Sequence, residues 1–285
     1  MRISMWTSFL YGRPFESIVR SLRKAGFDSA DLSAEHLLEL LESARPREQA
    51  KRWRELADGL GLPLLQTHLA LESDLTLPPK ESAKQLDFLK RQLELAMFLE
   101  IPAAVVHVSQ CSGLDRPAAD VDQPGTGLDP EREEHAVWYL TQLSAFLRGS
   151  PTRLALENLF FAELRAKNLV RLIELSGNPP ELGICLDTGH LHCTGGDQVE
   201  FLETAADRLI ALHVADNTGV ADYHMLPLGR GTIDWRSFMR KLKTIGYPGI
   251  FNLEASGENS PVYPEILDAK LDYAAKVVQA LMKME

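Results

Sequence analysis

The chain has 285 residues, of which 45% are hydrophobic and 25% are charged, which suits a globular protein able to bury a sizeable core. Asp and Glu number 40 against 30 Lys and Arg, and the resulting net charge of -10 does not favour a binder of nucleic acid phosphates, although a local basic face stays open. Three irregularly spaced cysteines argue against both a disulfide framework and a thiolate zinc site.

Short apolar runs rich in β-branched residues alternate with longer amphipathic stretches along the chain. The apolar runs predict eight strands, at residues 3–7, 29–33, 64–69, 104–109, 154–158, 183–187, 210–215 and 250–255. Apolar residues that recur every three or four positions predict helices at 15–25, 82–99, 133–147, 168–176 and 235–245. Gly26 and Gly246 follow two of these helices, where a left-handed cap would sit.

The alternation of strands and helices predicts a parallel sheet covered by helices. Residues 8–13, after the first strand, lack the Gly-rich phosphate turn of an open doubly wound sheet. Eight units favour an α/β fold of the (β/α)₈ TIM barrel type, with residues 1–285 as a single domain. A long irregular stretch at about 110–130 follows the fourth strand and is predicted to be an active-site loop.

Acidic or imidazole side chains stand at the ends of four consecutive predicted strands: Glu157, Asp187, His213 and Glu254. One such residue could simply cap the next helix, but four together are hard to explain as caps. Carboxyl ends of barrel strands meet at one mouth, and charges there are unfavourable unless they are paired or bound to metal. Oxygen ligands with one imidazole predict a divalent ion, Mn²⁺, Co²⁺, Zn²⁺ or Mg²⁺.

Other polar and aromatic residues near strand ends are candidates for substrate contacts. We expect four histidines to hydrogen-bond hydroxyl groups: His68, His107, His190 and His224. Trp6 ends the first strand and could form an apolar wall for a bound substrate, with core packing as the alternative. Arg230 lies between two glycines and could reach a terminal hydroxyl or phosphate, with a solvated loop arginine as the alternative.

At these residues the chain resembles the xylose isomerase-like barrel superfamily, in particular its sugar isomerase and epimerase branch, which includes ketose 3-epimerases. The resemblance runs from residues 25–33 to the last strand, and residues 213–235, with their G-x-G-x-I-D-W turn, are its most specific segment. It implies the same four metal ligands, and substrate contacts from Glu163 and His190. The arginine that those epimerases carry six residues after the metal histidine is Gly219 here, which leaves the sugar open.

The chain also resembles endonuclease IV, a trinuclear-zinc enzyme of abasic-site repair with the same barrel. That resemblance implies up to three Zn²⁺ ions, with these residues as additional ligands: His68, His107, His190, Asp222 and His224. The DNA-reading segments of that family are replaced, for example by Gly189 where its D-T-C-H motif has cysteine. A nucleic acid partner is therefore the less favoured reading.

The resemblance to the sugar branch implies proton transfer next to a carbonyl through a metal-stabilised enediolate. Glu157 and Glu254 are the candidate catalytic bases, because they come from different strands and could flank a substrate. Isomerisation, epimerisation and dehydration of a cyclic polyol stay open, as do free against phosphorylated sugars, a homo-oligomer and a non-enzymatic metal-stabilised binder. No signal peptide or membrane span is evident, so we expect a soluble cytoplasmic protein without a membrane partner.

Overall fold

The computed structural model describes residues 1–79, 83–109, 127–160, 164–255 and 263–284. Residues 110–126 of the predicted active-site loop and Glu163 lie outside the described residues. No helix in the described ranges is both long enough and apolar enough to cross a bilayer.

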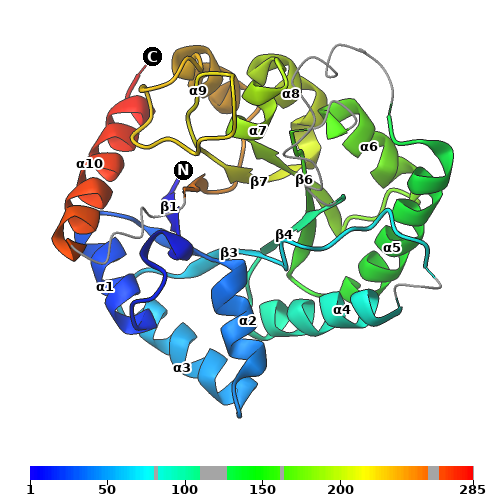
Figure 1. Ribbon diagram of the computed structural model, residues 1–285, viewed down its shortest axis with the longest axis horizontal. Coiled ribbons are helices and arrows are strands. Elements are labelled where there is room, and N and C mark those ends of the chain that lie inside the picture. The colour runs from blue at the N-terminus through cyan, green and yellow to red at the C-terminus, as the bar shows by residue number, and fades with distance from the viewer. Residues whose placement is uncertain (80–82, 110–126, 161–163, 256–262, 285) are drawn as a thin grey trace.

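Eight parallel strands form the ring at the centre of the molecule (Figure 1). They are β1 (Ile3–Trp6), β2 (Ser29–Leu32), β3 (Leu64–His68), β4 (Ala103–His107), β5 (Arg153–Glu157), β6 (Leu182–Asp187), β7 (Leu209–His213) and β8 (Phe251–Leu253). Each strand from β1 to β7 pairs with the next in the chain, and β1 also pairs with β8. The register shifts at Ala30/Asp31 in β2 and at Ile184/Cys185 in β6. Val214 closes the ring, because its N–H donates to Asn252 O (2.8 Å) and its carbonyl accepts from Glu254 N (3.1 Å). The predicted TIM barrel is confirmed.

Helices surround the ring on its outside (Figure 1). The longer ones are α1 (Phe15–Ala25), α2 (Ala34–Glu42), α3 (Pro46–Gly59), α4 (Ala83–Phe98), α5 (Pro130–Leu147), α6 (Ala166–Leu175), α8 (Gln198–Ala205), α9 (Trp235–Thr244) and α10 (Pro264–Met282). Short turns near the mouth are η1 (Thr7–Leu10) and α7 (Thr188–Cys193), and η4 (Ala206–Arg208) precedes β7. The predicted cap at Gly26 is confirmed: it ends α1 with a left-handed φ of 99°, and its N–H donates to Arg23 O.

The apolar core divides into a large layer between strands and helices and a small cluster inside the ring. The inner cluster consists of small side chains on β4 to β7: Ala103, Val105, Ala155, Cys185 and Ala211. The opposite side of the ring interior carries buried polar side chains instead, from Ser4, Asp31, Gln66 and Asn252. This polar half adjoins the strand ends at which the predicted site residues stand.

Candidate metal centre

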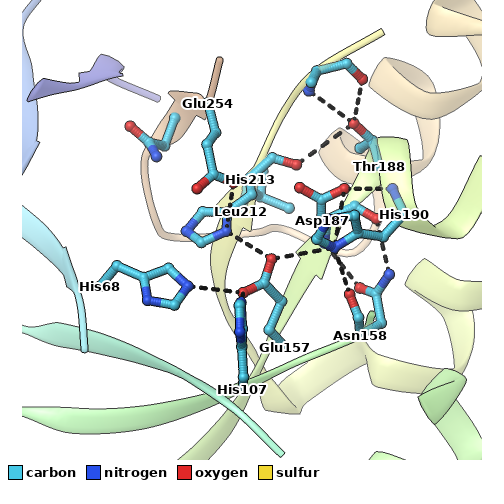
Figure 2. A network of polar contacts seen from close by, with 12 residues as sticks. His68, His107, Glu157, Asn158, Asp187, Thr188, His190, Leu212, His213 and Glu254 are labelled. Carbon is cyan, nitrogen blue, oxygen red and sulfur yellow. Dashed lines mark hydrogen bonds and ion pairs between the residues drawn. The ribbon is translucent and has the colours of Figure 1, made fainter. Parts of the chain in front are cut away.

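Glu157, the last residue of β5, lies at the centre of a ring of imidazoles at the mouth of the barrel (Figure 2). Its Oε2 is 3.1 Å from His68 Nε2 and 3.3 Å from His107 Nε2. Its Oε1 is 2.9 Å from Nδ1 of His213. These side chains come from the ends of β3, β4, β5 and β7, and all are buried.

The four predicted metal ligands come together at this mouth. One ligand atom each from Glu157, Asp187, His213 and Glu254 lies within 4.8 Å of all the others. His213 Nδ1 is 2.9 Å from both Glu157 Oε1 and Glu254 Oε2. Ligands at right angles on a divalent ion with bonds of about 2.1 Å lie about 3.0 Å apart, so this spacing fits a metal ion.

The two carboxylate oxygens of Asp187 differ in their hydrogen bonding. Its Oδ1 caps α7 by accepting from His190 N at 2.6 Å. Its Oδ2 is buried and has no hydrogen-bond partner among the described residues. A helix cap would need only one of these oxygens, and an unpartnered buried carboxylate oxygen is unfavourable unless a cation or a ligand satisfies it. The residues present therefore fit a divalent metal.

Four histidines are oriented by backbone carbonyl oxygens that accept from Nδ1. The pairs are His68 with Leu69 O (2.6 Å), His107 with Leu71 O (2.9 Å), His190 with Asn158 O (3.0 Å) and His224 with Glu254 O (3.3 Å). Such a bond places a proton on Nδ1 and turns Nε2 toward the site. His213 is turned the other way, with Nδ1 toward the carboxylates.

The charges of the centre follow from its burial and its close pairing. Burial raises the pKa of Glu157, but His213, His107 and His68 outweigh it and hold that pKa well below its ordinary value. Burial likewise raises the pKa of Glu254, and His213 again brings it below the ordinary value. Burial raises the pKa of Asp187 to about 6, because the neighbouring histidines offset only part of it. Both glutamates are therefore ionised at neutral pH.

A second cluster lies beside the first, on α7 and on the loop after β7. Asp222 Oδ2 is 2.8 Å from His224 Nε2 and 3.3 Å from His190 Nε2. Burial lowers the pKa of His224, but Asp222 and Asp187 outweigh it and raise the pKa to about 9. Asp187, His190 and His224 form one further group with metal-ligand spacing, and His68, Glu157 and His213 form another.

Asp216 holds the loop that carries Asp222 and His224. Its Oδ2 accepts from Gly229 N (2.7 Å), Gly231 N (2.9 Å) and Trp235 Nε1 (3.0 Å). A Cβ at Gly231 would lie 2.1 Å from Asn217 O, so this position accepts glycine alone without a shift of the backbone. The G-x-G-x-I-D-W turn is thus built around one buried carboxylate.

The other predicted substrate-contact residues lie in different surroundings. Trp6 is 8% exposed at the end of β1, and its Nε1 has no hydrogen-bond partner among the described residues. Arg230 is exposed, and its Nη1 donates to Leu226 O at 3.2 Å, within its own loop. Trp6 thus has a free donor near the mouth, whereas the structure does not bring Arg230 into the buried cluster.

Three residues that hold the centre together had no predicted role. Asn158 bridges β5 and β6: its Nδ2 donates to Asp187 O (2.9 Å) and its Oδ1 accepts from Asp187 N (2.8 Å). Thr188 Oγ1 donates to Ala215 O (2.8 Å), which ties α7 to the end of β7. Asp31 lies in β2, is fully buried, and has a pKa that burial raises to about 6. A signal was present, since acidic residues and Asn are depleted inside strands.

The sequence model of the xylose isomerase-like TIM barrel family matches residues 19–281. The chain belongs to this family. Two curated relatives are the uncharacterized protein y4fM of Sinorhizobium fredii, 27% identical over 172 residues, and the uncharacterized protein MJ1311 of Methanocaldococcus jannaschii, 35% identical over 108 residues. The first match covers 59% of this chain and 52% of the relative, and the second covers 36% of each. The chain thus matches about half or less of the length of these relatives.

Solved structures of sugar epimerases share the fold over nearly their whole length. A D-psicose 3-epimerase from Clostridium cellulolyticum H10 superposes with a TM-score of 0.77 at 18% identity, covering 99% of both chains. A 3-keto-D-glucoside 4-epimerase from E. coli gives a TM-score of 0.76 at 16% identity, covering 99% of this chain and 98% of that one. Within the xylose isomerase-like family, the likeness at these identities establishes the shared barrel.

Proposed function

We propose that this family member is a divalent-metal-dependent sugar isomerase or epimerase that moves a proton next to a carbonyl. The observation that carries the proposal is the buried group of Glu157, Asp187, His213 and Glu254, with ligand atoms within 4.8 Å of one another. The family and the fold shared with sugar epimerases support the same chemistry. We expect one tightly held ion per chain and a small sugar or sugar phosphate as substrate.

Glu157 and Glu254 are the groups that we assign to proton transfer. Their lowered pKa values keep them ionised, so either can take a proton from a carbon beside a carbonyl. In an epimerisation the other carboxylate takes a proton from water and delivers it to the opposite face of the carbon; in an isomerisation the same carboxylate delivers the proton it removed to the adjacent carbon. A bound cation would supply positive charge beside the substrate oxygens, where negative charge develops.

Substrate orientation falls to the polar groups around these carboxylates. The unpartnered Nε1 of Trp6 can donate to a hydroxyl oxygen. His107 and His190 are 7% and 6% exposed, more than His213 at 0%. His107 Nε2 lies 3.3 Å from Glu157 Oε2, and His190 Nε2 lies 3.3 Å from Asp222 Oδ2 in the neighbouring cluster. They can hydrogen-bond hydroxyl groups without being buried beneath the metal ligands.

A second candidate function rests on the two additional groups with metal-ligand spacing. If these groups hold ions of their own, the centre resembles that of a multinuclear phosphodiesterase such as endonuclease IV. Three zinc ions per chain together with cleavage of abasic DNA would establish that reading in place of ours. Loss of water from a cyclic polyol would instead identify a dehydratase with the same carboxylates.

The deciding experiment follows deuterium exchange by NMR in D₂O, with saturating Mn²⁺ and a panel of ketoses and ketose phosphates. The wild type should exchange a proton beside the carbonyl and form an epimer or isomer, with one ion per chain by elemental analysis. Glu157→Gln and Glu254→Gln should each lower the turnover rate by more than the roughly 10²–10⁴-fold that is typical of one acid–base group, because metal binding falls too.

The matched control is Glu133→Gln, which removes a carboxylate that pairs with Arg171 on the outer helices (2.7 Å) and should leave turnover unchanged. Loss of turnover with retained exchange at one carbon in either site variant would identify a two-base epimerase. If both site variants convert substrate at the wild-type rate once metal is restored, the bases lie elsewhere and the mechanism is wrong.

A further inference from the structure

We propose that Asp31 is a positioning residue for the metal centre: it accepts a hydrogen bond from Nε2 of His213 and so keeps Nδ1 of that imidazole turned toward the metal. This inference rests on the metal site of the proposed function and adds to it a residue outside the ligand set. Asp31 comes from β2, whereas His213 ends β7. The two side chains thus reach toward each other from different parts of the ring.

The first argument is the orientation of His213. Its Nδ1 is 2.9 Å from oxygens of both Glu157 and Glu254, so Nδ1 is the nitrogen that would bind a metal. A neutral imidazole that binds metal through Nδ1 carries its proton on Nε2 and needs an acceptor there. The four other histidines of the site have a carbonyl acceptor on their rear nitrogen, but His213 Nε2 is buried without a hydrogen bond among the described residues.

The second argument is that Asp31 offers the matching acceptor. Asp31 Oδ2 is 3.7 Å from His213 Nε2, and Asp31 Oδ1 is buried with no hydrogen-bond partner among the described residues. An unpartnered donor thus lies beside a carboxylate whose other oxygen, Oδ1, still has no partner among the described residues. A movement of less than about 1 Å would bring the pair to hydrogen-bond distance.

The third argument is that Asp31 is itself held firmly in place. Its Oδ2 accepts from Gln66 Nε2 at 2.9 Å and from Asn252 Nδ2 at 2.6 Å. Gln66 Nε2 also lies 3.3 Å from Leu212 O, the residue next to His213. The polar half of the ring interior therefore links β8, β2 and β3 to the backbone beside the metal-binding imidazole, as a support for a ligand requires.

The thiol of Cys185 is the other polar group beside the His213 ring. A thiol sulfur is a weak acceptor, whereas a carboxylate is a strong one, and a charged acceptor forms the stronger bond. The geometry therefore favours Asp31 over Cys185, and the two can be separated by substitution.

The test measures Zn²⁺ affinity by competition with a chelating dye for the wild type, Asp31→Asn, Cys185→Ala and Ser4→Ala. Ser4 is the matched control, because it lies in the same polar interior with no hydrogen-bond partner for Oγ among the described residues. Asp31→Asn should weaken Zn²⁺ binding by about 10–100-fold, the range for partners that orient a ligand. Ser4→Ala and Cys185→Ala should bind as the wild type does. Wild-type affinity in Asp31→Asn, or an equal loss in Cys185→Ala, would overturn the proposal.

A second measurement needs no variant and covers the case in which Asp31→Asn does not fold. In the Zn²⁺-loaded wild type labelled with ¹⁵N-histidine, NMR should place the His213 proton on Nε2, protected from exchange with solvent. A proton on Nδ1 would contradict the inference. If the wild type binds no Zn²⁺ at all, the proposed function fails; if it binds Zn²⁺ and Asp31→Asn is unchanged, this inference alone fails.

Discussion

His36 and His213 are imidazoles buried to nearly the same extent, 2% and 0% exposed, in contrasting surroundings. His36, in the first turn of α2, has Nδ1 3.0 Å from Thr7 Oγ1 and 2.8 Å from Ser33 Oγ, and its ring packs edge-on against Trp53. His213 instead has carboxylate oxygens on both sides of its ring. Burial lowers the pKa of His36 to about 4, with Glu35 opposing it only in part.

Burial also lowers the pKa of His213, but Cys185, Glu254 and Glu157 outweigh it and raise the pKa well above its ordinary value. The difference teaches that burial makes an imidazole neutral only where its partners are neutral too. Hydroxyls and aromatic rings serve the packing of a helix, whereas several carboxylates around one imidazole form a place for positive charge. That charge can be a proton or a metal ion, and the two compete.

The largest effect should come from removing a carboxylate of the His213 environment. Glu254→Gln should weaken metal binding by at least about 100-fold, because removal of a metal ligand costs more affinity than removal of a residue that only orients a ligand. Elemental analysis after dialysis measures it, with Glu265→Gln on the exposed side of α10 as the control. Equal metal in both variants would mean that the carboxylates around His213 do not form a cation site.

The next effect concerns stability at low pH: we expect His36 to lower the free energy of unfolding as the pH falls. Its pKa is about 4 in the folded protein against 6.5 ordinarily, so the unfolded chain takes up the proton first as the pH falls. The stability that neutral His36 gives the folded state is fully present above pH 6.5 and is lost as the pH falls to about 4. The free energy of unfolding should fall by up to ~1.4 kcal/mol per pH unit from this group, and by roughly 3 kcal/mol in all.

Urea unfolding of the wild type and His36→Gln across this range measures the contribution. The variant should have a lower free energy of unfolding at pH 7.5, because packing is lost, but a shallower fall as the pH drops. Parallel curves for the two proteins would show that His36 titrates normally and would remove the contrast with His213.

The smallest effect should come from Ser33→Ala, which tests whether the surroundings of His36 serve only the stability of the fold. Ser33 Oγ accepts from His36 N (3.5 Å) as the N-cap of α2 and also contacts the ring, so its loss should lower the free energy of unfolding by about 1 kcal/mol. Metal content should stay at the wild-type level. Ser17→Ala, inside α1, serves as the control, and an equal change there would argue against capping.

The fold could be predicted because strands buried on both faces produce continuous apolar runs that stand out in a sequence. All eight predicted strands are present, with bounds that differ by two residues at most. The spacing of apolar residues did not predict α2. Only Ser33 separates this helix from β2, so no loop divides the apolar pattern of the strand from that of the helix.

The meeting of Glu157, Asp187, His213 and Glu254 could also be expected, because barrel topology brings strand ends to one mouth. Their role as ligands stays a prediction. No sequence pattern shows which nitrogen of His213 faces the carboxylates. Nor does one show that Asp31, on a distant strand, lies 3.7 Å from Nε2 of that ring. Both depend on strand register and side-chain rotamers, which only the three-dimensional packing determines.

The attachment of Gly229, Gly231 and Trp235 to the single Oδ2 of Asp216 has a consequence for altering the protein by design. The base of the loop after β7 is anchored, while Val220 and Tyr223 near its tip are 72% and 56% exposed. Those two side chains can be varied in a library with the anchor left intact, so that His224 keeps its place. Gly231 should be left out of any such library, because its backbone has no room for a side chain.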